Sequence, residues 1–128
     1  MSRKKSRDYA FKLIFEKFFH EPELDLEPDE DEEVLSSEDR EFASFLIKGV
    51  NEHYDEIMDI IEDNTVGYKV ERIFKVDLAI LVLAVYELKF DGSSPKEAII
   101  NEAVSLAKKY STEKSFSFIN GVLAKVVE

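Results

Sequence analysis

The sequence predicts an all-α fold, a compact helical domain of about six to seven helices. Apolar residues recur three and four positions apart through most of the long segments, which is the spacing of a helix with one face against a core. A second observation is the run Leu78–Val85, eight residues without a polar side chain. A membrane-spanning helix needs about twenty such residues, so this run points instead to a helix buried inside a protein.

This apolar run organises the rest of the chain. Its β-branched residues would also allow a buried strand, but the sequence offers no second such run to pair with it in a sheet. We therefore expect Asp77–Leu88 to form a helix that is apolar all round and lies in the middle of a bundle. Its polar residues, Asp77 and Glu87, are expected where the helix ends emerge from the bundle.

Size and composition suit a single domain, expected to span residues 1–128 and to bury about two thirds of the surface of the unfolded chain. Hydrophobic residues make up 45% of the chain and include ten phenylalanines, which is ample core material. The absence of cysteine excludes a disulfide framework and a thiolate zinc site. No apolar segment follows the Met1–Lys5 start, so we expect a soluble cytoplasmic protein without signal peptide or membrane span.

The net charge of −11 originates in one segment. Residues 21–41 contain twelve acids and one base, which equals the net charge of the whole chain, and the remainder holds sixteen bases and sixteen acids. The acidic total therefore does not exclude a local site for a polyanion. Residues 21–35 also contain two of the three prolines, so we expect an acidic, solvated loop there.

The first helix is expected to begin near Ser6, whose hydroxyl suits an N-cap, and to end near His20. Asp8 in its first turn is placed well against the helix dipole. Its apolar residues form an arc wider than one buried face requires: Ala10, Phe11, Leu13, Ile14, Phe15, Phe18 and Phe19.

The helical segment after the acidic loop is capped by Ser36 or Ser37. Its apolar stripe runs for about 25 residues: Phe42, Phe45, Leu46, Gly49, Val50, His53, Ile57, Ile60 and Ile61. That length exceeds an ordinary helix, so we expect a kink or break between Asn51 and Asp55. Gly49 inside the pattern costs about 1 kcal/mol relative to alanine, which predicts that another helix passes close to it.

Turn signals separate the remaining helices. Asn64–Gly67 is a stop signal, and Val70–Phe74 is expected to form a short helical turn before the central helix. The next helix begins at a capping box with Ser94 as N-cap, Pro95 at the first helical position and Glu97 at the third.

The last two helices meet at a basic connection. The first of them ends at Lys108–Tyr110, and Ser111 or Thr112 caps the second. We expect the last helix to pack four apolar residues inward: Phe116, Ile119, Leu123 and Val126.

Few residues suggest catalysis or metal binding. Glu16 and His20 have the i, i+4 spacing that can bring two metal ligands together, but chance explains this spacing more readily. The acidic loop lacks the glycine of a calcium loop, and no glycine-rich phosphate loop is present. The acids that remain as candidates for proton transfer are of a kind more often solvated or locally paired: Asp77, Glu87 and Glu102. We predict no enzyme, no metal site and no cofactor.

Two basic clusters are better candidates, for binding. The first lies at the start of the first helix, directly before aromatic residues: Arg3, Lys4, Lys5 and Arg7. Basic side chains reach phosphates and aromatic rings stack on unpaired bases, which is typical of single-stranded RNA binding; a frayed, solvated terminus would have the same composition. The second cluster falls between the last two helices, where it would equally complement a helix dipole: Lys108, Lys109, Tyr110 and Lys114.

The C-terminal third of the chain resembles the NusB family. Ile100–Lys108 and Phe118–Leu123 are similar to the paired signature of that family, and Leu81–Leu88 is similar to its apolar segment ending in Tyr-Glu-Leu. Phe45–Val50 resembles an earlier family element, and Arg7–Phe15 resembles its first helix, which follows a basic tip. The resemblance spans the chain apart from the acidic loop.

This resemblance implies two small three-helix bundles and a non-enzymatic role in transcription antitermination, including that of ribosomal RNA operons. Such proteins pair with the small-subunit ribosomal protein also called NusE, and the pair binds the single-stranded boxA element of nascent RNA. Other antitermination factors and RNA polymerase are then indirect partners. By position, Asp77 matches an acid that faces the ribosomal-protein partner. The RNA-contact candidates are Arg3, Lys4, Lys5, Arg7, Tyr110, Lys114 and Phe118.

Two positions depart from the family pattern. Val82 stands where the family usually has arginine, which removes a basic group near the expected partner and RNA surface. Lys114 stands where a relative carries an acid, which adds one. We therefore expect a difference in local RNA affinity or sequence preference. The acidic loop is also unusual, and solubility or repulsion of wrong polyanions is its expected role.

Two other functions fit parts of the sequence. Some cytosine methyltransferases for ribosomal RNA carry a similar helical domain, but this sequence has neither a cofactor-binding glycine loop nor a cysteine nucleophile. The second alternative is a structural module that forms a homodimer through the wide apolar arc of the first helix.

Overall fold

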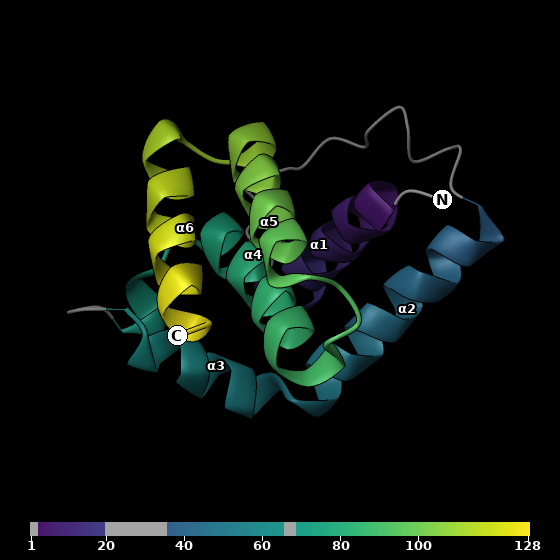
Figure 1. Ribbon diagram of the computed structural model, residues 1–128, viewed down its shortest axis with the longest axis horizontal. Coiled ribbons are helices and arrows are strands. Elements are labelled where there is room, and N and C mark those ends of the chain that lie inside the picture. The colour runs from purple at the N-terminus through teal and green to yellow at the C-terminus, as the bar shows by residue number, and fades with distance from the viewer. Residues whose placement is uncertain (1–2, 20–35, 66–68) are drawn as a thin grey trace.

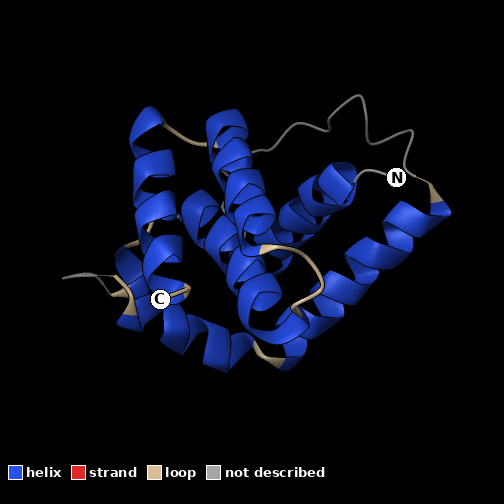
Figure 2. Ribbon diagram, in the orientation of Figure 1, coloured by secondary structure: helices blue, strands red, loops and turns tan. Residues whose placement is uncertain are grey.

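The computed structural model describes residues 3–19, 36–65 and 69–128, and these contain helices and turns but no strand (Figures 1 and 2). The α-helices are α1 (Arg3–Phe19), α2 (Ser37–Glu52), α3 (Tyr54–Asp63), α4 (Lys75–Tyr86), α5 (Lys96–Tyr110) and α6 (Glu113–Val126). Two short helical segments complete the described part: η2 (Val70–Arg72) and η3 (Glu87–Asp91). The all-α prediction is confirmed.

Helix α4 is the centre of the fold. It packs against α1, α2, α3, α5 and α6, and it runs through the middle of the molecule in Figure 1. The groups α1–α3 and α4–α6 therefore share one continuous core around α4. Every residue from Val76 to Tyr86 is buried, as expected for a helix that is apolar all round.

The ends of α4 differ from the prediction. Asp77 and Glu87 do not emerge from the bundle, because they are only 5% and 1% exposed. Beyond Tyr86 the chain continues through the π-helical turn η3. The helical conformation ends at Gly92, whose φ of 67° is a conformation that favours glycine.

Helix α1 begins three residues before the predicted N-cap. Ser6 lies inside the helix and is fully buried, and its hydroxyl donates a hydrogen bond to Asp39 Oδ1 over 3.2 Å. Five of the seven residues of the apolar arc are buried, and α1 packs on α2 and α4 within the same chain, so only Leu13 and Phe18 remain partly accessible for the predicted dimer face. The predicted end at His20 and the acidic loop at 21–35 lie outside the described residues.

Helices α2 and α3 confirm the predicted break, because α2 ends at Glu52 and α3 begins at Tyr54. Ser36 is the N-cap of α2 and forms a reciprocal capping box with Asp39. The close approach at Gly49 is also confirmed: a methyl group on Gly49 would overlap the ring of Tyr86.

The start of α5 corrects the predicted capping box. Pro95 occupies the N-cap position and α5 begins at Lys96, while the Ser94 hydroxyl accepts a hydrogen bond from Arg7. In α6, Thr112 is the N-cap residue, and Ile119, Leu123 and Val126 are buried as predicted, but Phe116 is only half-buried.

Candidate nucleic-acid interface

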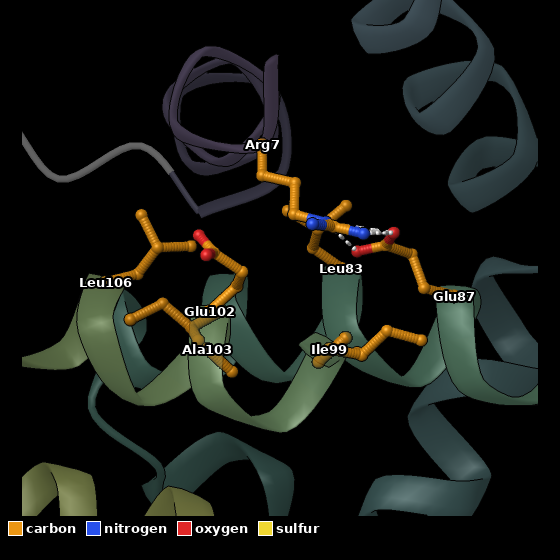
Figure 3. A pocket seen from close by; sticks show the side chains of 9 residues that line it. Arg7, Leu83, Glu87, Ile99, Glu102, Ala103 and Leu106 are labelled. Carbon is orange, nitrogen blue, oxygen red and sulfur yellow. Dashed lines mark hydrogen bonds and ion pairs between the residues drawn. The ribbon is translucent and has the colours of Figure 1, made fainter. Parts of the chain in front are cut away.

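Arg7, predicted as an RNA contact, is a buried residue that holds the fold together. Its guanidinium donates to the Glu87 carboxylate over 2.8–3.0 Å and to the Ser94 hydroxyl over 3.1 Å. Arg7 is 6% exposed, and Figure 3 shows it reaching from α1 to Glu87 across a cavity of about 10 Å³. The structure therefore removes Arg7 from the exposed basic surface, because Glu87 neutralises it inside the protein.

The other residues of the first basic cluster lie in the first turn of α1. Arg3 is the first residue of the helix, and the side chains of Lys4 and Lys5 are exposed. Lys4 lines a cleft of about 280 Å³ between α1 and α5, here called the α1–α5 cleft. The other residues of this cleft are Asp8, Glu102, Ser105, Leu106, Lys108 and Lys109.

The α1–α5 cleft brings the two predicted basic clusters together. Lys108 and Lys109 stand in the last turn of α5 and are exposed, and the ammonium group of Lys109 lies 3.0 Å from Asp8 Oδ2. Lysines from two helices that are about a hundred positions apart in sequence thus share one surface. The charge of Lys109 is partly balanced by Asp8, and Lys108 is a second exposed cation that lines the cleft.

Tyr110, another predicted RNA contact, is fixed from two sides. Its hydroxyl donates to Asp8 Oδ1 over 2.7 Å, and its ring centroid lies 5.2 Å from that of Phe11. Burial and the hydrogen bond to Asp8 raise the pKa of the Tyr110 phenol. The half-buried ring therefore has a set orientation and remains a protonated hydrogen-bond donor at neutral pH.

The predicted residues Asp77, Lys114 and Phe118 meet at a second hollow, here called the α4–α6 groove. It has a volume of about 320 Å³, and Lys114 is exposed beside the half-buried ring of Phe118. The remaining lining residues are Arg72, Ile73, Phe74 and Ser115. A cation and an aromatic ring on either wall of a groove suit a phosphate and an unpaired base.

Asp77 contributes to this groove from below its surface. The Ser111 hydroxyl donates a 2.6 Å hydrogen bond to Asp77 Oδ1, and the hydroxyls of Ser111 and Ser115 are 2.7 Å apart. These contacts tie the α5–α6 connection to the start of α4. Asp77 therefore acts on the groove by holding its wall in place.

Two groove residues, Arg72 and Phe74, were not predicted. Phe74 is 43% exposed although it is a large apolar side chain, and Arg72 in η2 is exposed beside it. The sequence offered one signal for them, a basic residue and an aromatic residue two positions apart in a short turn. Nothing in the sequence places that turn against α6.

Val82 lies in the core and not at a surface. Its side chain is fully buried in the middle of α4. The prediction that position 82 lies next to the RNA and partner surface is therefore corrected: Val82 fills the core.

The described part of the chain was also compared with the requirements of a metal site and of a membrane span. Across residues 3–19, 36–65 and 69–128, no three His, Asp or Glu side chains are grouped so that they could hold a metal ion. Within the same ranges, no helix combines the length and the apolar character required to cross a membrane.

Comparison with known proteins identifies the family. A model of the NusB family matches residues 4–128. The transcription antitermination protein NusB of Clostridium botulinum (strain Loch Maree / Type A3) is 40% identical over 141 residues, which cover 99% of this chain and 100% of the relative. The protein of the same name from Agathobacter rectalis is 41% identical over 132 residues, 98% of each chain.

Solved structures agree in fold. T. maritima NusB superposes with a TM-score of 0.84 at 31% identity, over 99% of this chain and 91% of that chain. A crystal structure of the antitermination factors NusB and NusE in complex with double-stranded RNA gives a TM-score of 0.80 at 28% identity, over 98% and 95% of the chains. Because the family model covers nearly the whole chain and curated relatives match it from end to end, the chain belongs to the NusB family.

Proposed function

We propose that the chain is a non-enzymatic transcription antitermination factor that pairs with the ribosomal protein NusE and binds the single-stranded boxA element of nascent RNA. The family supports the role in antitermination, since the matched relatives are transcription antitermination proteins along their entire length. A solved relative that superposes over 98% of this chain is bound to NusE and RNA, which supports both kinds of partner. That relative holds a duplex, so the preference for a single strand is our own proposal.

The observation that carries the proposal is the gathering of cations around the connection between α5 and α6. In a chain with a net charge of −11, exposed lysines from three helices line the two hollows beside this connection: Lys4, Lys108 and Lys109 line the α1–α5 cleft, and Lys114 lines the α4–α6 groove. Lys5, also exposed, follows Lys4 in the first turn of α1. Such a local excess of positive charge attracts a polyanion even when the whole molecule is acidic. Arg3, Tyr110 and Phe118 complete the proposed RNA surface.

The α4–α6 groove is proposed as the place where the RNA and the protein partner meet. Lys114 and Phe118 on α6 suit the RNA, and the exposed ring of Phe74 on the opposite wall suits an apolar contact with NusE. Asp77, the expected partner contact, is proposed to act by fixing Ser111 and thereby the shape of the groove.

A salt titration tests the electrostatic mechanism. If boxA RNA neutralises three to five positive groups, the logarithm of the association constant should fall against the logarithm of salt concentration with a slope of about −2 to −3.5. Fluorescence anisotropy with single-stranded boxA RNA and with the same sequence as a duplex measures both slope and preference. A slope of zero, or equal affinity for the duplex, contradicts the proposal.

Charge removal tests the location of the surface. The triple substitution Arg3→Ala, Lys4→Ala and Lys5→Ala should weaken RNA binding about 10- to 100-fold and reduce the salt slope by about two. The helical circular dichroism spectrum should not change. The matched control removes three exposed lysines on other parts of the fold and should bind RNA as the unsubstituted protein does: Lys48→Ala, Lys96→Ala and Lys125→Ala.

A pull-down with NusE, with and without boxA RNA, tests the partner. The unsubstituted chain should retain NusE, and RNA should increase the retained amount because both proteins contact it. Phe74→Ser should weaken the retention of NusE while leaving the helical spectrum intact, since the ring is largely exposed. Full retention by this variant would exclude the groove wall as the partner contact.

A further inference from the structure

A third hollow lies between the outer faces of α5 and α6, and Lys108 is the only described residue of the predicted basic clusters that lines it. This α5–α6 groove has a volume of about 390 Å³, within the usual range of about 300–1,000 Å³ for small-ligand sites. Asn101, Ser105 and Lys108 recur at helical spacing along its α5 wall, and Phe116, Ser117 and Asn120 form its α6 wall. The groove thus presents amides, hydroxyls, a cation and an aromatic ring together.

The charge of the groove distinguishes it from most of the protein surface. The chain has 28 acidic residues among 128, yet none of the described residues that line this groove is an acid. The α1–α5 cleft, in contrast, contains Asp8 and Glu102. The groove therefore suits a ligand that carries negative charge next to neutral hydrogen-bonding groups.

Its polar groups are available for a ligand. Asn101 and Asn120 are exposed, and the described part of the chain provides no hydrogen-bond partner for either amide. The ammonium group of Lys108 lies 5.4 Å from the ring centroid of Phe116, so a cation from one wall reaches across to the aromatic ring of the other. A planar base stacked on Phe116 and a phosphate beside Lys108 would use both residues at once.

The groove is continuous with the proposed RNA surface. Lys108 and Ser105 line the α5–α6 groove on one side of α5 and the α1–α5 cleft on the other. An RNA strand that runs along the cleft therefore reaches the groove by crossing a single helix at Lys108. This continuity identifies the occupant as a further nucleotide of the same strand.

We infer that the α5–α6 groove is a subsite for one unpaired nucleotide that flanks the boxA element, with its base on Phe116 and its phosphate at Lys108. Asn101 and Asn120 read the edge of the base, and adenine is the preferred base because its adjacent acceptor and donor match one side-chain amide. The inference rests on the proposed RNA binding and adds to it a site that selects the flanking sequence.

Extended RNAs test the subsite. The probes are fluorescein-labelled boxA RNA and the same RNA with four adenosines, or four uridines, added at either end. The adenosine extension at one end should tighten binding about 5- to 30-fold, the gain expected from one stacked and recognised base. The uridine extension should give a clearly smaller gain.

The double variant Asn101→Ala/Asn120→Ala should lose most of the adenosine gain while binding the unextended RNA as before. Alanine is a better helix former than asparagine, so this variant should keep its fold. Phe116→Leu should reduce the gain for adenosine and uridine alike, and Asn51→Ala, an exposed amide on α2, is the matched control that should keep it.

The outcomes separate the inference from the proposed function. If the unextended RNA binds but no extension tightens it, or if the gain survives in the double variant, the subsite is excluded and the proposed function stands. Failure of boxA RNA to bind at all excludes both.

Discussion

The Arg7–Glu87 pair is located where three parts of the chain meet. Arg7 comes from α1, Glu87 from the turn after α4, and Ser94 from the connection to α5. Both charges are almost completely removed from water. Because each charge is desolvated against the other, loss of one partner leaves a buried charge without its ion pair.

Arg7→Ala should therefore lower the free energy of unfolding by about 3–5 kcal/mol. The measurement is urea denaturation followed by far-ultraviolet circular dichroism. The double substitution Arg7→Met/Glu87→Leu should recover most of the loss, because neither charge remains buried. An unchanged urea midpoint for Arg7→Ala would show that the pair contributes nothing to stability.

Asp39 makes the stability depend on pH. The backbone N–H of Ser36 donates to Asp39 Oδ2 over 3.2 Å, and this hydrogen bond is the main cause that lowers the pKa of the carboxyl below its ordinary value of 3.8. Its contribution is therefore complete above about pH 4 and declines as the pH falls through the lowered pKa of the folded state.

Asp39→Asn should consequently lower the urea midpoint at pH 7, and the difference from the unsubstituted protein should shrink at pH 3, because this pH lies below the ordinary pKa of 3.8, where the contribution of the carboxylate declines. Asp59→Asn, at an exposed position of α3, serves as the control and should show a smaller difference at pH 7. A difference for Asp39→Asn that is equally large at both pH values would rule out the charged form as the cause.

At the scale of helices, local pattern was sufficient for most elements. The break near His53, the turn at Val70 and the apolar helix α4 follow from hydrophobic spacing and capping residues, which act within a few positions of the chain. The burial of Arg7 and its hydrogen bond to Ser94 were not predictable in this way, because they depend on partners about eighty positions away. The sequence marked Arg7 as polar, and only the packing of α1 against α4 and the turn after it made this residue internal.

Gly49 shows what such packing requires of an element. The ring of Tyr86 from the end of α4 occupies the space that a side chain at Gly49 would need. Gly49→Ala should therefore destabilise the protein by about 1–3 kcal/mol, the usual cost of overpacking, despite the better helix propensity of alanine.

The matched control is Gly121→Ala in α6, where an added methyl group meets no atom within 4 Å. This substitution should stabilise the protein by about 0.5–1 kcal/mol. Thermal unfolding of both variants, of Tyr86→Leu and of the double variant Gly49→Ala/Tyr86→Leu measures the effect. The loss of stability in the double variant should be close to that of Tyr86→Leu alone and smaller than the sum of the losses in the two single variants. Opposite signs at the two glycines are the expected result.

At the scale of the whole molecule, charge is separated. Acids dominate residues 21–41, whereas the cations of the proposed RNA surface gather around the α5–α6 connection and the start of α1. The two regions are linked through the fold, since Asp39 near the start of α2 is hydrogen-bonded to Ser6 of α1, and Lys5 lowers the pKa of Asp39 further by its charge. In the sequence, the six acids at 27–33 come only a few residues before α2, the helix that contacts the basic end of α1.

Neutralising these six acids, by Glu→Gln and Asp→Asn substitutions, should therefore tighten RNA binding roughly ten-fold at low salt, because less negative charge then repels the phosphates. The advantage should disappear toward 1 M salt, where the Debye length falls to about 3 Å. A variant with the same change in charge at the end of α2 and on α3 tests whether location matters: Glu52→Gln, Asp55→Asn, Glu56→Gln, Asp59→Asn, Glu62→Gln and Asp63→Asn. In Figure 1, α3 lies away from the α5–α6 connection, so this variant should gain much less affinity. Equal gains in both variants would mean that net charge alone governs the attraction of RNA.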